Sequence, residues 1–296
     1  MAQQWFYPAG TAAQPGWDLS LGAHDSVLKV EGWQYTGIRT ATLGQQPLVL
    51  AAAAEERIII PLTGDLEVTV EGKTYQLQGR SSVFAGPADV LYTGVGRSVE
   101  VTGQAGVRCA LASAPAAVDY PVRHIRRDEI PVELRGAGLC SRQVHNFGTP
   151  ATLEADRFIV CEVLTPAGNW SSYPPHKHDV EQEGESALEE IYYFETRPVA
   201  DAPEEAQDAV GYQRVYASDQ RPIDVTAEVR TGDVVLVPYG WHGPAMAAPG
   251  YDLYYLNVMA GPSRVRQWLI SDDPHHGWVR QTWQEQQIDP RLPFGG

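Results

Sequence analysis

Hydrophobic and polar positions alternate in short segments along this chain, with turn residues between them. Residues 66–70 alternate with period two, and residues 57–62 form a run rich in isoleucine. The turn residues 71–73 separate the first of these segments from residues 74–77, an arrangement typical of a β-hairpin. The first part of the chain is therefore predicted to consist of strands.

The second half has the same character. Four segments rich in branched and aromatic side chains are predicted to be strands, at 157–164, 191–194, 234–237 and 254–258. With 28 glycines and 22 prolines as punctuation, the pattern favours an all-β sandwich or jelly-roll barrel over alternating strands and helices. Few helices are expected, and residues 263–270 are the best candidate for a short one.

A weak repeat relates the two halves. The string EERIII at 55–60 parallels EEIYYF at 189–194, and GRSSVFAGP at 79–87 parallels GDVVLVP at 232–238. Two related β-sandwich units would explain both similarities.

The two units are predicted to differ in chemistry. Small residues and prolines interrupt the strand pattern at 112–122, so we place an N-terminal unit at 1–120 and a C-terminal unit at 121–296. No histidine lies between His24 and His124. The first unit therefore lacks the ligands for a histidine-based metal site, and we assign it a structural role.

Composition narrows the possible partners. The chain has 296 residues and a formal net charge of −15, which argues against nucleic acid or an anionic membrane as a partner. The three cysteines are widely spaced and do not form a disulfide framework. No signal peptide or membrane-length apolar run is evident, so a cytoplasmic protein is expected.

Three histidines and a glutamate are the strongest chemical signal. His176 and His178 are two residues apart, so both can reach one ion from extended backbone, and Glu190 and His242 follow later. Neutral imidazoles and a carboxylate suit a borderline divalent metal. Taken alone, the His-Lys-His-Asp string could equally be a solvated turn, because two prolines precede it.

The surroundings of these residues resemble the metal site of the cupin superfamily. Gly232, Pro238 and Gly240 have the spacing of the second cupin motif, and His242 follows them. The departures are clear: one residue rather than two separates Gly240 from this histidine, and eleven residues separate His178 from Glu190. We interpret the polar insertion as a loop on the barrel.

A closer resemblance accounts for these departures. The strings WSSYPPHKHD (170–179), EEIYYF (189–194) and PYGWHGP (238–244) are similar to those of the bicupin uronate isomerases, among them the 5-deoxy-glucuronate isomerases of inositol catabolism. The resemblance covers essentially the whole chain and implies a bicupin fold. It also implies four metal ligands, which are His176, His178, Glu190 and His242. Glu189 is the alternative carboxylate; Glu190 is preferred because it directly precedes the aromatic strand.

The implied reaction turns 5-deoxy-D-glucuronate into 2-deoxy-5-keto-D-gluconate through a cis-enediolate, within myo-inositol catabolism. A divalent ion, zinc or manganese, would polarise the carbonyl. The reaction also needs a proton carrier. The candidates are His145, Tyr193 and Glu162.

The substrate carboxylate requires a cation. Arg142 is the leading candidate because its segment leads into the second unit, and arginine binds carboxylates in bidentate geometry. Lys177 is a second candidate, although strand alternation turns it away from the metal.

Two other functions use the same residues. A cupin dioxygenase would bind a redox metal at three histidines and a glutamate, and a non-catalytic cupin would only bind a sugar. A homo-oligomer is also compatible with the sequence. The acidic stretch 201–208 is expected to be a solvated loop, with a lid as the alternative.

Overall fold

The isoleucine-rich run of the first half lies in the longest strand of the computed structural model, which describes residues 5–23, 30–218 and 221–295. This strand, β5 (Glu55–Val70), pairs with β7 and β9 along its first half and with β6 and β8 along its second half. It therefore passes through both layers of the first sandwich. The predicted hairpin is confirmed, since Val70 pairs with Lys73 across the turn.

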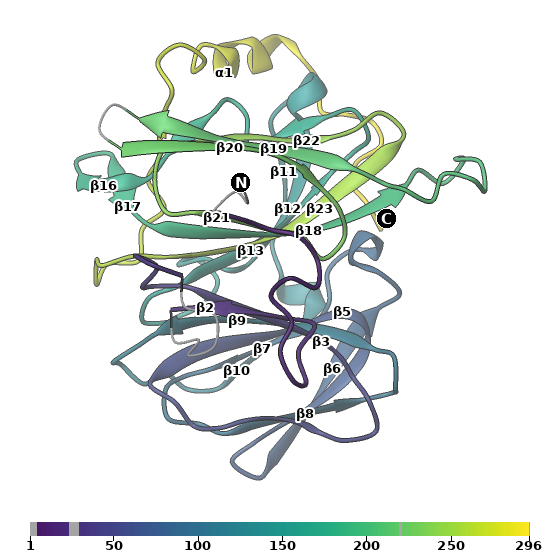
Figure 1. The fold of residues 1–296 in the computed structure, drawn as a ribbon, viewed down its shortest axis with the longest axis vertical. Coiled ribbons are helices and arrows are strands. Elements are labelled where there is room, and N and C mark those ends of the chain that lie inside the picture. Colours follow the sequence, from purple (N-terminus) through teal and green to yellow (C-terminus); the bar gives the residue numbers. More distant parts are fainter. Residues whose placement is uncertain (1–4, 24–29, 219–220, 296) are drawn as a thin grey trace.

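The first unit is a single curled sheet of nine strands, the lower half of the molecule in Figure 1. Along its main path the order is β10-β7-β5-β9-β3-β2. Its strands besides β5 are β2 (Leu19–Gly22), β3 (Gly37–Thr42), β4 (Leu48–Leu50), β6 (Lys73–Arg80), β7 (Val90–Thr93), β8 (Val99–Gly103), β9 (Arg108–Pro115) and β10 (Arg123–Ile125).

The second unit consists of two facing sheets and a small hairpin (Figure 1). The sheet next to the first unit contains, in order, β1 (Phe6–Tyr7), β21 (Val234–Val237), β18 (Glu189–Pro198), β23 (Tyr251–Ala260), β13 (Ile159–Thr165), β12 (Arg142–Gly148) and β11 (Val132–Arg135). The outer sheet contains β20 (Arg221–Val229), β19 (Gly211–Ser218), β22 (Trp241–Ala247), β15 (His176–Lys177), β24 (Ser271–Asp272) and β14 (Trp170–Ser171). The hairpin is β16 (Asp179–Gln182) with β17 (Glu185–Ala187).

Helices are short throughout the described residues. The α-helix α1 (Val279–Thr282) leads into the 3₁₀ turn η4 (Trp283–Glu285), and the other 3₁₀ turns are η1 (Val83–Ala85), η2 (Arg127–Glu129) and η3 (Gly138–Cys140). In the described part of the chain, no helix has the length and apolar character needed to cross a membrane. The all-β bicupin prediction is thus confirmed.

The helix predicted at 263–270 is wrong, because this segment is irregular. Contacts with distant parts of the chain hold it in place. The Arg266 guanidinium donates to the carbonyl oxygens of Phe158 and Gly148, each at 2.9 Å, and Leu269 exchanges hydrogen bonds with Ser186. These long-range bonds replace the local bonds of a helix.

Strand pairing crosses the predicted boundary at 120/121 in both directions. The strand β10 pairs with β7 of the first unit, although it follows residue 120. The strand β1 pairs with β21 of the second unit, although it lies near the start of the chain. The two units therefore exchange strands at their edges.

One hydrophobic cluster joins the two units. Side chains of β5 such as Ile58 and Ile60 pack in the same cluster as Ile191 and Tyr193 of β18. Because successive side chains of a strand point to opposite faces, Tyr192 and Phe194 instead face the interior of the second sandwich. This sheet, called the inner sheet below, thus turns one face toward the first unit and the other face toward the interior of the second sandwich.

Candidate metal centre and active site

The three predicted histidine ligands converge inside the second sandwich. His176 on β15 pairs directly with His242 on β22, and His178 follows one residue after β15. One imidazole nitrogen from each of the three residues lies within 4.8 Å of the other two, and all three side chains are buried. The His-x-His string therefore places both imidazoles on one face, as its spacing predicts.

Glu190 adds a carboxylate to this cluster from the start of β18. Its Oε2 lies 3.1 Å from His178 Nε2 and 3.0 Å from His242 Nε2. Although the second distance is short, His242 Nε2 has no hydrogen-bond partner of acceptable geometry among the described residues. A buried nitrogen lone pair without a partner is a suitable ligand for a cation.

Backbone carbonyls orient all three imidazoles. The Nδ1 atoms of His176, His178 and His242 lie 3.3, 3.2 and 3.2 Å from the carbonyl oxygens of Pro174, Leu188 and Gly240, respectively. A proton on Nδ1 that is donated to a carbonyl leaves the Nε2 lone pair free. This tautomer is the one that metal-binding histidines adopt, with the second nitrogen held by a hydrogen bond.

The local electrostatics also fit a cation. Burial lowers the pKa of His176, and the neighbouring histidines lower it further, so this imidazole is neutral. Burial raises the pKa of Glu190, but the adjacent His178 and His242 imidazoles outweigh it and hold the pKa well below its usual range. Three imidazoles and an ionised carboxylate could therefore hold one divalent ion.

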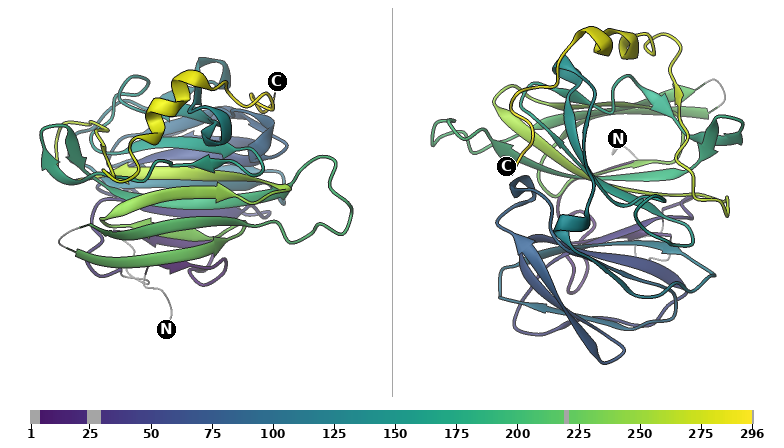
Figure 2. Two further views of the ribbon diagram at one scale, coloured as in Figure 1. Left: turned by 90° about the horizontal axis from the view of Figure 1, so that it is seen from above. Right: turned by 180° about the vertical axis from the view of Figure 1, so that it is seen from behind.

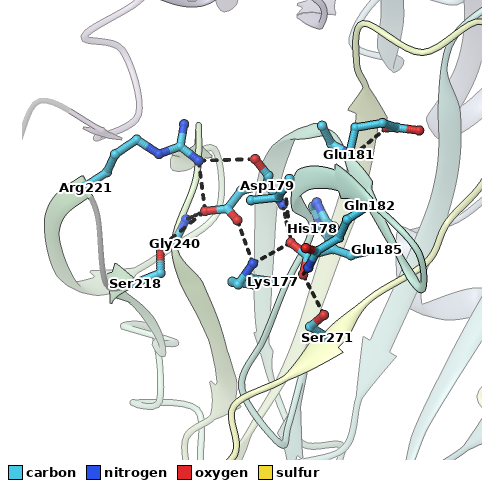
Figure 3. A network of polar contacts seen from close by, with 12 residues as sticks. Lys177, His178, Asp179, Glu181, Gln182, Glu185, Ser218, Arg221, Gly240 and Ser271 are labelled. Carbon is cyan, nitrogen blue, oxygen red and sulfur yellow. Dashed lines mark hydrogen bonds and ion pairs between the residues drawn. The ribbon is translucent and has the colours of Figure 1, made fainter.

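A polar network fixes the strands that carry these residues (Figure 3). Asp179 Oδ2 accepts a hydrogen bond of 2.9 Å from the backbone N–H of Gly240, and it lies 3.0 Å from the Arg221 guanidinium. Asp179 directly follows His178, and Gly240 lies two residues before His242. The carboxylate therefore links the two segments that supply the histidines.

Lys177 belongs to this network rather than to the histidine cluster. Its Nζ lies 2.9 Å from Asp179 Oδ1 and 2.6 Å from Glu185 Oε1 (Figure 3). Lys177 is absent from the side chains that line the cavity beside the histidines. The structure therefore does not bring this predicted substrate-binding residue to the site.

Glu189 is excluded as the alternative carboxylate ligand. Its two carboxylate oxygens accept hydrogen bonds of 2.8 Å from the backbone N–H groups of Gln34 and Tyr35 in the first unit. The side chain thus faces the interface, whereas Glu190 faces the histidines. The preference for Glu190 agrees with this geometry.

A cavity of about 250 Å³ adjoins the histidine cluster. Its lining combines His176 and Glu190 with Arg142, three hydroxyl side chains and several apolar groups. The hydroxyls belong to Ser172, Tyr192 and Tyr255, and sequence reasoning missed all three. The alternation rule could have identified Tyr192, which is two residues from Glu190, but nothing local indicates Tyr255.

Arg142 is a buried cation in this lining. Its side chain is 6% exposed, and its Nη1 donates to the Cys140 carbonyl oxygen at 3.0 Å. Burial lowers its pKa to about 10, and the charges of Arg135 and Arg280 contribute to the shift. Those two arginines pair with Glu133 and Asp272, but no carboxylate of the described residues lies within ion-pair distance of Arg142. Arg142 is thus placed to bind an external anion.

The three predicted proton carriers lie on the other face of the sheet, and the structure does not bring them to the cavity. His145 Nδ1 and the Arg80 guanidinium both contact the Glu162 carboxylate, at 3.0 and 2.9 Å, in the interface with the first unit. Tyr193 accepts a hydrogen bond of 2.8 Å from Arg108 in the same interface. Strand alternation explains the result, since neither Glu162 nor Tyr193 shares the face of Glu190.

The acidic stretch 201–208 lies far from the cavity. It belongs to the connection between β18 and β19, which projects from the body of the molecule (Figure 2). Glu190 is at the opposite end of β18, eight residues before Pro198. At about 3.3 Å per residue this separation is on the order of 25 Å, so the loop does not cover the site.

Comparison with known proteins gives a consistent picture. The model of the KduI/IolB family matches residues 20–279. The 5-deoxy-glucuronate isomerase of Geobacillus kaustophilus is 42% identical over 257 residues, covering 85% of this chain and 88% of that protein. The same enzyme of Bacillus subtilis strain 168 is 41% identical over 228 residues, covering 76% and 80%.

Solved structures agree. An IolB-like protein from Salmonella typhimurium has a TM-score of 0.81 at 34% identity, covering 93% of this chain and 98% of that one. An oxalate decarboxylase from Bacillus subtilis has a TM-score of 0.58 at 11% identity, covering 92% and 80%, which indicates a shared fold only. The chain is therefore a member of the KduI/IolB family.

Proposed function

We propose that this protein is a metal-dependent aldose–ketose isomerase that converts 5-deoxy-D-glucuronate into 2-deoxy-5-keto-D-gluconate, a step of myo-inositol catabolism. The observation that carries the proposal is one cavity, beside the histidine cluster, that is lined both by two of the proposed metal ligands and by an arginine without a carboxylate partner among the described residues. The curated relatives, which are named 5-deoxy-glucuronate isomerases, support the choice of substrate.

The ligands in this proposal are His176, His178, Glu190 and His242, and the ion is zinc or manganese. Four protein ligands leave open positions on an octahedral ion, and the bound ion would polarise the substrate carbonyl and stabilise the enediolate. Neither metal needs to change its oxidation state, because the reaction has no net redox change. The free imidazole nitrogens and the ionised carboxylate described above favour such an ion.

Arg142 is proposed to hold the substrate carboxylate. The protein carries a net charge of −15, so an anionic substrate needs a local cation against the overall field. A buried guanidinium that lacks an internal counter-ion gains a charge-assisted hydrogen bond when the substrate enters. This contact would point the aldehyde end of the substrate toward His176 and Glu190.

The walls of the cavity contribute by their low exposure to solvent. The lining residues His176, Glu190, Tyr192 and Tyr255 are each at most 8% exposed. Reduced solvation strengthens the attraction between the guanidinium and the carboxylate. The predicted cytoplasmic location and the homo-oligomer stay predictions.

The test is an assay with 5-deoxy-glucuronate under anaerobic conditions. We expect the metal-loaded protein to form the ketose without oxygen uptake, and a chelator to abolish the activity. If the metal-loaded protein forms no ketose, the isomerase assignment is wrong. Turnover that requires oxygen would indicate the dioxygenase instead, and binding without turnover would indicate a sugar-binding cupin.

A further inference from the structure

Three hydroxyl groups form a short chain across the wall of the cavity. Ser172 Oγ lies 3.1 Å from Tyr192 OH and 3.1 Å from Tyr255 OH. The three side chains are 8%, 1% and 1% exposed, respectively, and all of them line the cavity with Glu190 and Arg142. The three hydroxyls therefore share one cavity with residues proposed to bind the metal and with the residue proposed to bind the carboxylate.

The backbone around Ser172 is built to hold this hydroxyl. Ser172 has a φ of +47°, a left-handed conformation that non-glycine residues adopt at some energetic cost. Gly243 packs against it so closely that an added Cβ would lie 1.8 Å from the Ser172 carbonyl oxygen. Gly243 directly follows His242, so the same tight contact places Ser172 next to the histidine cluster.

The hydrogen-bonding capacity of the chain is not used up. Each hydroxyl oxygen has two lone pairs, and the two contacts between the three groups use only two of these. Tyr192 also contacts Glu190 and Tyr255 also contacts Ser171, but lone pairs of the three oxygens remain for another molecule. Among the residues that line the cavity, no other side chain carries a hydroxyl.

The isomerisation needs such a group. As a general base takes the proton from the carbon beside the aldehyde, its electron pair forms the carbon–carbon double bond, and the oxygen of the resulting enediolate takes up a proton to give the enediol. In the second half, the neighbouring hydroxyl loses its proton and becomes the new carbonyl, while the same base returns its proton to the former aldehyde carbon. One proton is thus given to a substrate oxygen and one is taken from the other substrate oxygen. A pair of protein hydroxyls that exchanges both protons is therefore neutral again at the end of the reaction.

We propose that Tyr255 and Ser172 are the catalytic pair that exchanges these protons with the two substrate oxygens, and that Tyr192 positions Ser172. This inference rests on the proposed isomerase function and assigns the oxygen-bound protons only. Burial raises the pKa of Tyr255 above its ordinary value, although Ser171, Ser172 and Arg142 oppose the shift. The phenol is therefore protonated at the start of each turnover, gives its proton to one substrate oxygen, and recovers a proton from the other.

The adjacent Tyr254 provides a matched control. Its side chain lies on the opposite face of β23 and donates a hydrogen bond of 2.7 Å to Glu162 in the interface. Tyr255→Phe and Tyr254→Phe each delete one buried hydroxyl from neighbouring positions of one strand. Only the first deletion removes a group from the cavity.

The experiment measures kcat, KM, metal content and the solvent deuterium isotope effect of these variants. We expect Tyr255→Phe to lower kcat on the order of 100-fold, because a positioned acid–base group contributes that much, with KM and metal content near those of the wild type. We expect Tyr254→Phe to keep kcat within about twofold of the wild type. A kcat of Tyr255→Phe within twofold of the wild type would overturn the proposal.

Ser172 is tested with two substitutions because its backbone is strained. Ser172→Ala and Ser172→Gly both remove the hydroxyl, but glycine accepts a positive φ without strain. We expect both variants to lose kcat to a similar degree, with Ser172→Gly the more stable. Recovery of kcat in Ser172→Gly would show that only the backbone matters. An inactive wild type would instead refute the isomerase function itself.

Discussion

The two sandwich units share a strand arrangement but differ in what they enclose. In the first unit β5 lies between β7 and β9, and in the second β18 lies between β21 and β23. The interior of the first unit is filled by apolar side chains such as Leu66, Val68 and Val101. The corresponding space in the second unit contains Glu190, Arg142 and the histidines. Burying these polar groups is unfavourable unless they are paired, so their presence indicates a functional role.

The same comparison shows how the units hold together. Glu56 accepts hydrogen bonds from the backbone N–H groups of Asp156, Arg157 and Phe158 across the interface, at 2.8, 2.7 and 2.9 Å. Glu189 receives two backbone N–H groups from the first unit in return. Glu56 is therefore the counterpart of Glu189 and not of Glu190.

The largest expected effect tests the chemical difference between the units. His176→Ala removes a proposed ligand, and we expect metal binding to be lost and kcat/KM to fall by about 1,000-fold or more. Metal analysis and the isomerase assay measure both. The control is His124→Ala on β10, in the sheet of the first unit, which should leave both quantities unchanged. Full activity of metal-free His176→Ala would show that the histidine cluster is not the reactive centre.

A stability measurement distinguishes the two faces of the inner sheet. Burial raises the pKa of Glu162, but Arg80 and His145 outweigh it and lower the pKa from 4.5 to about 2. The resulting stabilisation is present above pH 4.5 and is lost as the pH falls toward 2, in total about 3 kcal/mol. We expect denaturant unfolding of the wild type to show about half of this loss between pH 4.5 and 3.

Glu162→Gln provides the comparison for that experiment. The variant should be less stable than the wild type at pH 7, because the buried Arg80 loses its partner. The difference between the two proteins should shrink as the pH falls from 4.5 to 3. Activity per folded molecule should remain. A loss of kcat in the folded variant would indicate that Glu162 takes part in catalysis.

Arg142→Ala tests the anion-binding part of the cavity. Loss of a charge-assisted contact with the substrate carboxylate should raise KM by about 100-fold, or about 2.7 kcal/mol. Arg142→Lys should recover only part of this loss, because lysine lacks the planar fork. Steady-state kinetics measure both, with Arg230→Ala on the exposed surface as the control. An unchanged KM in Arg142→Ala would contradict the assignment.

Glu56→Gln examines the link between the units. The carboxylate accepts from three backbone N–H groups and from Tyr92 OH, so an amide would direct an N–H group at a donor. We expect the free energy of unfolding to fall by about 2 kcal/mol. Calorimetry or denaturant titration measures it against Glu67→Gln, an exposed position of β5. Equal stability of both variants would argue against this role.

Asp179→Ala should have the smallest effect. It breaks the link between the segments that carry His178 and His242, and we expect metal affinity to fall about tenfold. Chelator competition measures the affinity directly and does not depend on turnover. Asp208→Ala, in the projecting loop, is the control. An affinity equal to that of the wild type would mean that the strands hold the ligands without this carboxylate.

Much of the site could be predicted because its information is local. The residue types of the histidine and glutamate ligands and the strings around them identify the metal cluster. The predicted proton carriers lie outside the cavity because of strand alternation: Tyr193 is three residues from Glu190 and therefore faces the opposite side of the sheet. Tyr255 was out of reach, because only the fold brings it to Ser172. The segment 263–270 failed for the same reason, since distant carbonyls bind Arg266.

The strand β1 has a consequence for synthesis of the protein. Phe6 and Tyr7 pair with Val235 and Val234, so the partner strand leaves the ribosome more than 220 residues later. At about 5–20 residues per second, β1 waits for at least ten seconds before it can pair. The first unit can assemble meanwhile, but the inner sheet of the second unit is completed only when β1 pairs with β21. A fragment that starts after β1 would expose the edge of β21, and such open edges promote aggregation.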